Sequence, residues 1–113
     1  MNQFKISYDE ENDDLFVYLD GVKSVGAVEI GNFVFDFGEG DKLVAFQISG
    51  ASEILSKLVR RAVEASRIKF LSAEIISFRN MAAISIEIDF GDRKERTTIL
   101  IPKIKEKSPI SNL

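Results

Sequence analysis

Polar and apolar residues alternate through the first half of the chain. The alternation starts at Phe4 and recurs in short segments up to Ile48. A period of two is typical of a β-strand that buries one face. The pattern predicts five strands, over residues 3–8, 15–19, 25–30, 33–37 and 43–48. The connections between them are too short for helical crossovers, so we expect an antiparallel β-meander.

The spacing of apolar residues changes from two to 3.6 after Gly50. Between Ile54 and Ala65 the apolar residues form one stripe, and charged residues occupy the other positions. This spacing is typical of an amphipathic helix. It predicts one helix over about residues 52–67, with Ser52 as the N-cap.

Strand patterns resume after the helix and continue almost to the end of the chain. They predict three further antiparallel strands, over residues 69–78, 82–90 and 97–101. Pro102 ends the last strand, because proline cannot donate a hydrogen bond to a neighbouring strand. We therefore predict a single α+β domain over residues 1–102, followed by a loose C-terminal tail over 103–113.

One helix is too small to cover this much sheet. A helix of roughly 16 residues is about 24 Å long and covers two or three strands that lie about 4.8 Å apart. Phe33, Phe35 and Phe37 share one face of their strand, which therefore needs another cover. We expect a homodimer in which these three side chains contact the second copy. The alternative is a monomer whose twisted sheet covers itself.

The composition excludes several kinds of site. The 113 residues are 45% hydrophobic and include no Cys, His or Trp. Without Cys and His the chain has no thiolate nucleophile, no imidazole base and none of the usual zinc or haem ligands. We expect no catalytic residues, no metal, no cofactor and no enzymatic activity. No apolar run resembles a signal peptide or a membrane span, so we expect a cytoplasmic protein that does not bind membranes.

The acidic turn Asp9–Asp14 superficially resembles a calcium-binding loop. Such a loop requires Gly at its sixth position and a bidentate Glu at its twelfth. Asp14 and Asp20 stand at these positions here. We therefore interpret the segment as a solvated hairpin turn.

Charge is unevenly distributed along the chain. Residues 1–53 contain 3 basic and 11 acidic residues, whereas residues 54–113 contain 12 basic and 7 acidic residues. Four basic residues fall on the polar side of the predicted helix: Lys57, Arg60, Arg61 and Arg67. Clustered cations can bind phosphates, so these residues support an alternative function in nucleic-acid binding. The net charge of −3 argues against it.

Two stretches of the first half resemble known family motifs. Tyr8–Leu19 reads YDEENDDLFVYL and is similar to a Y-D-x-x-x-D-x-L-x-[VI]-x-L opening. Phe35–Ile48 is similar to a strand, an acidic-glycine turn and a further strand, and Ala51-Ser52 to the A-S that opens the next helix. These motifs resemble a small prokaryotic domain-of-unknown-function family, number 2283. The resemblance covers residues 4–58.

The resemblance implies a β-meander followed by a helix, and it implies no established activity and no catalytic residues. Some members of that family are thought to occur beside small toxin-like proteins, which implies a small protein as partner. We therefore predict a non-catalytic protein-binding module that self-associates through an apolar sheet face.

Overall fold

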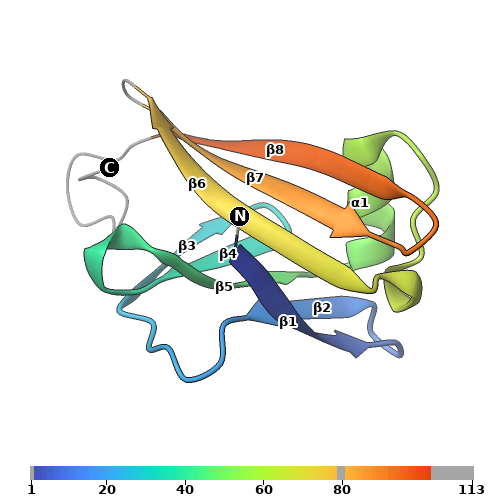
Figure 1. Ribbon diagram of the computed structural model, residues 1–113, viewed down its shortest axis with the longest axis horizontal. Helices are drawn as coiled ribbons and strands as arrows, with labels where there is room; N and C mark the ends of the chain where they lie inside the picture. The colour runs from blue at the N-terminus through green and yellow to red at the C-terminus, as the bar shows by residue number, and fades with distance from the viewer. Residues whose placement is uncertain (1, 79–80, 103–113) are drawn as a thin grey trace.

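The computed structural model describes residues 2–78 and 81–102, so the predicted tail lies outside the described residues. These residues form eight strands and one α-helix (Figure 1). The elements are β1 (Asn2–Asp9), β2 (Asp14–Tyr18), β3 (Gly26–Ile30), β4 (Phe33–Phe37), β5 (Leu43–Ile48), α1 (Ala51–Val59), β6 (Phe70–Phe78), β7 (Met81–Asp89) and β8 (Lys94–Pro102). Short 3₁₀ turns occupy Glu39–Asp41 and Ala65–Arg67.

The first five strands pair in the order β3-β4-β5-β2-β1, and all neighbours are antiparallel. The predicted meander is therefore wrong at one point, because β2 pairs with β5 and not with β3. In this order Leu15 lies opposite Ile48, and Val17 lies opposite Phe46. The connection after β2 follows a Greek-key path.

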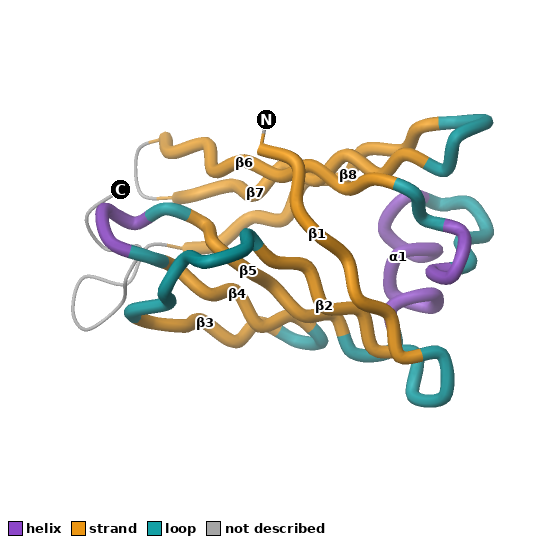
Figure 2. The backbone as a smooth tube through the Cα atoms, turned by 60° about the horizontal axis from the view of Figure 1, so that its bottom comes forward, coloured by secondary structure: helices purple, strands orange, loops and turns teal. Residues whose placement is uncertain are grey.

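Strand β1 connects this half of the sheet to the second half. Residues Asn2–Phe4 of β1 pair with β6, whereas residues 5–9 pair with β2. Strands β6, β7 and β8 continue the sheet as an antiparallel meander. Figure 2 shows the result, in which β6–β8 fold back over β2–β5 and α1 closes one end. The eight strands form one sheet in a half-barrel.

The core lies between the two halves of the folded sheet. The β4 and β5 rings pack together there, with the Phe35 and Phe46 centroids 5.8 Å apart. The opposite half contributes three isoleucines of β7, which are fully buried: Ile84, Ile86 and Ile88. Each half therefore covers the apolar face of the other.

This arrangement corrects the placement predicted for three phenylalanines. Phe33, Phe35 and Phe37 are 6%, 0% and 0% exposed. They belong to the core of this chain and present no surface to a second copy. The sequence pattern showed correctly that their face needs a cover, and the cover is supplied by β6–β8 of the same chain.

Helix α1 is shorter than the apolar spacing predicted. It ends at Val59, where Arg60 takes a left-handed conformation with φ of 58°. The chain then turns back, and the Ser56 hydroxyl accepts a hydrogen bond from the Val63 N–H (2.8 Å). Val63 and Ala65, which fall within the range predicted for the helix, fill the core from this returning segment. Among the described residues no helix has the length and hydropathy needed to cross a membrane.

Candidate functional site

The most extensive side-chain network of the described residues centres on Asp13, in the turn between β1 and β2. Its carboxylate accepts hydrogen bonds from the Tyr8 hydroxyl (2.6 Å), the Ser52 N–H (3.0 Å) and the Ser52 hydroxyl (2.9 Å). The main-chain oxygen of Asp13 accepts a further bond from the Ala51 N–H (2.8 Å). Asp13 therefore caps the N-terminus of α1 from a separate hairpin.

Ser52 has a different role from the predicted N-cap. The N-cap position is Gly50, which has φ of 63° and no capping side chain. The Ser52 hydroxyl instead donates to Asp13 and accepts a bond from the Ala65 N–H (3.0 Å). Ser52 thus connects α1 by hydrogen bonds to the β1–β2 hairpin and to the 3₁₀ turn Ala65–Arg67.

The electrostatics of the network favour an ionised Asp13. Burial alone would raise the pKa of this carboxyl. The bonds from Tyr8, from the Ser52 hydroxyl and from the backbone of Ser52 and Glu53 outweigh burial, so the pKa of Asp13 lies below its usual value. The same hydrogen bond to Asp13 raises the pKa of Tyr8. A carboxylate held by this many donors is suited to positioning α1 and not to proton transfer.

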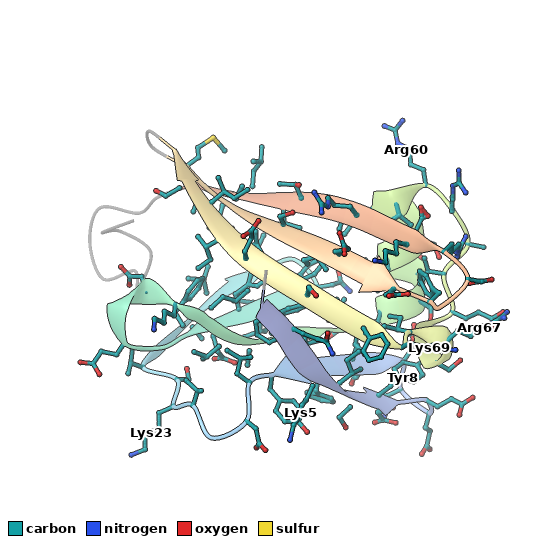
Figure 3. All side chains as sticks on the ribbon, in the orientation of Figure 1. Lys5, Tyr8, Lys23, Arg60, Arg67 and Lys69 are labelled. Carbon is teal, nitrogen blue, oxygen red and sulfur yellow. The ribbon has the colours of Figure 1, made fainter. Side chains whose placement is uncertain are left out.

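The four basic residues predicted to bind nucleic acid do not all lie on α1. Lys57 is the one that lies on α1, where it forms an ion pair with Glu53 (3.2 Å). Arg60 ends the helix, and Arg61 and Arg67 follow it in the returning segment. Figure 3 shows Arg60 and Arg67 at different places on the molecule. The basic helix face expected from the sequence is therefore not formed.

The acidic turn forms a hairpin connection, as the sequence indicated. Asp9 accepts bonds from the Asn12 side chain (2.8 Å) and the Asn12 N–H (3.3 Å). Within residues 2–78 and 81–102, no group of three or more acidic side chains is arranged to hold a metal ion.

An exposed apolar surface lies beside strand β8. This strand is one edge of the sheet, and its last described residues include the uncharged run Thr97–Ile101. On the outer face, Ile76, Ala83 and Leu100 stand side by side across β6, β7 and β8. We call these three residues the β8 patch. Ile76 is 46% exposed and Leu100 is 53% exposed, whereas Ala83 between them is buried.

A groove of about 570 Å³ lies where β1 separates from β6. Strand β1 forms one wall, and the segment Ala65–Phe70 forms the other. We call this feature the fork groove. Figure 3 shows Tyr8 and Lys69 near each other at this place. Sequence patterns did not indicate the groove, because its two walls are about 60 residues apart in the chain.

The fold and these surfaces define a small α+β protein built on one folded antiparallel sheet. Residues 5–52 match the model of a family described as protein of unknown function, DUF2283. This match confirms the resemblance seen in the sequence. Tyr8, Asp13 and Ser52 all lie within the matched residues. Hydrogen bonds through Asp13 therefore connect the Tyr8–Leu19 motif to the Ala51-Ser52 motif.

An uncharacterized protein of Methanocaldococcus jannaschii is 38% identical to this chain over 52 residues. The match spans 46% of this chain and 45% of the relative, so the chain spans less than half of the relative's length. No solved structure matches the chain.

Proposed function

We propose that the protein is a non-catalytic protein-binding module that forms a homodimer through strand β8. The observation that carries the proposal is the open edge of this strand. In the described part of the chain, β8 pairs with β7 and has no strand on its other side. A cytoplasmic location, expected from the sequence, is part of the same proposal.

An open edge presents unpaired backbone N–H and C=O groups to another strand. Many proteins protect such edges with charged residues or with proline. Here Lys94, Glu95 and Arg96 occupy the start of β8, and Pro102 occupies its end. The run Thr97–Ile101 between them contains neither a charge nor a proline, and threonine, isoleucine and leucine all suit a strand.

The same run is compatible with antiparallel pairing to a second copy. If the twofold axis passes at Ile99, Thr98 lies opposite Leu100 of the second copy, and Thr97 lies opposite Ile101. No like charges face each other within this run. The β8 patches of the two copies then adjoin on one outer face, and Leu100 loses part of its exposure to water.

Leu100→Lys tests the proposal. The side chain points to solvent, so the substitution preserves the core but places two lysines beside the twofold axis. We expect the dimer dissociation constant to rise by about tenfold or more. The matched control is Phe16→Lys, because Phe16 is 39% exposed on the outer face of β2, on the other half of the sheet.

Sedimentation equilibrium on the wild type and both variants gives the dissociation constants. Circular dichroism on the same samples checks that each variant is folded. Equal constants for folded Leu100→Lys and Phe16→Lys would contradict the proposed interface.

A further inference from the structure

The fork groove exposes a second stretch of unpaired backbone. Strand β1 pairs with β6 through Asn2–Phe4, and beyond Phe4 the two strands diverge. From Lys5 to Asp9, β1 pairs with β2 on one side and with no described strand on the other. This free edge faces the segment Ala65–Phe70 across the groove. The groove therefore resembles a sheet position from which one strand is missing.

Part of the groove lining is apolar. Ile6, Tyr8 and Ile68 are partly buried where they pack against the core, and they also line the groove. Two aromatic side chains lie on its margins, with Tyr18 37% exposed and Phe70 50% exposed. Such a surface can accept the alternate apolar side chains of an extended peptide.

The charge of the groove contrasts with that of the chain. Among the described residues, the charged ones that line it are Lys5 and Lys69, and no carboxylate is among them. The chain as a whole has a net charge of −3. Lys5 forms an exposed ion pair with Asp20 (2.7 Å), whereas the Lys69 side chain extends over Gly91. Lys69 therefore lies at the margin of the groove, where its side chain also runs against the turn between β7 and β8.

We propose that the fork groove binds an extended acidic peptide segment of another protein, which pairs with Lys5–Tyr8 of β1 as an added strand. Backbone hydrogen bonds to β1 hold the peptide, and its alternate side chains contact Ile6, Tyr8 and Ile68. Carboxylates on the peptide lie near Lys5 and Lys69.

A peptide fits these features better than a nucleic acid. Nucleic-acid binding depends on several cations that neutralise successive phosphates. Two lysines line the groove, whereas a free strand edge is useful to a peptide and not to a nucleotide chain. The site lies between β1 and the segment Ala65–Phe70 and includes no residue of β8, so it is separate from a dimer formed through β8.

The direct test is amide NMR of the full chain with defined peptides. The probe is a blocked peptide of alternating glutamate and valine, about eight residues long and added to about 1 mM. We expect shifts in the amides of Lys5–Tyr8 and slower hydrogen exchange along this segment. The first control peptide replaces glutamate with lysine, and the second carries N-methyl groups at every second residue on its pairing edge. Both are expected to bind about tenfold more weakly.

The matched variants are Lys69→Glu and Lys23→Glu. They make the same charge change, but Lys23 lies on the loop between β2 and β3, away from the groove (Figure 3). We expect Lys69→Glu to weaken binding about tenfold and Lys23→Glu to change it less than about twofold.

Three results would overturn the proposal. They are the absence of amide shifts at Lys5–Tyr8, equal binding of the N-methylated peptide, and equal effects of the two lysine variants. Shifts of these amides by an oligothymidine, without shifts by the acidic peptide, would assign the groove to nucleic acid instead. Dimer formation can be measured on the same samples, so failure of this site is distinguishable from failure of the β8 interface.

Discussion

Asp13 connects parts of the chain that local sequence does not relate. Its carboxylate and main-chain oxygen together accept bonds from Tyr8, Ala51 and Ser52. Asp13 itself has a left-handed backbone, with φ of 54°, which turns its carboxylate toward the start of α1. The family-like motif residues thus have an identifiable structural role, because they fix the helix onto the first hairpin.

We predict that Asp13→Asn lowers the free energy of unfolding by about 1–2 kcal/mol at neutral pH. Asparagine keeps one acceptor oxygen but loses the charge and part of the hydrogen bonding. The folded-state pKa of Asp13 lies below its usual 3.8, so its contribution is complete above that value and is lost as pH falls through the lowered pKa. The difference between wild type and variant should therefore shrink between about pH 5 and pH 2.

Urea unfolding at several pH values measures this difference. Asp20→Asn is the control, because Asp20 also has a lowered pKa but lies in an exposed pair with Lys5. We expect little effect from that substitution. A pH-independent difference for Asp13→Asn would show that the charge of Asp13 is not what stabilises α1.

At the scale of elements, the end of α1 depends on one residue in an unusual conformation. Arg60 takes the left-handed conformation that terminates many helices, which is a position that glycine favours. The apolar spacing continues through Ala62 and Ala65, so it predicted a helix to about residue 67. Of the predicted apolar stripe, Leu55 and Ala65 are buried, whereas Leu58 is 39% exposed. The spacing gave no sign of the left-handed residue at which the helix ends.

We predict that Arg60→Gly raises the free energy of unfolding by about 1 kcal/mol, because glycine has no Cβ to strain this conformation. Arg61→Gly is the matched control. Arg61 does not have a left-handed backbone, so glycine relieves no strain there. Its Nε also lies 3.9 Å from Oε2 of Glu95, so its replacement should lower the free energy of unfolding. Thermal unfolding of the wild type and the two variants measures these changes. A lower unfolding midpoint for Arg60→Gly than for the wild type would contradict the prediction.

Most strands were predictable from alternation, whereas their order was not. The five strands before Gly50 lie close to their predicted ranges, because each buries one face and exposes the other. The pairing of β2 with β5 could not be read from local pattern, since it depends on which apolar faces meet across the sheet. Tyr8 and Ser52 were quoted as motif residues, but their common contact with Asp13 became visible through the fold alone.

At the scale of the whole molecule, the two halves of the folded sheet cover each other's apolar faces. The inner faces of both halves are buried within one chain, including Phe33, Phe35 and Phe37. The two proposed interfaces therefore lie on outer surfaces and open edges. Among the described strands, β8 stands at one end of the sheet with no further neighbour, and the divergence of β1 from β6 leaves the fork groove in the middle.

The measurement that tests the central claim most directly is the solution mass of the intact chain by light scattering, over a range of dilutions and at low and high salt. The β8 account predicts twice the 12.7 kDa of the chain. The dimer should persist at high salt, because backbone hydrogen bonds and apolar contacts hold it together. A mass of 12.7 kDa at every concentration up to about 1 mM would contradict the account.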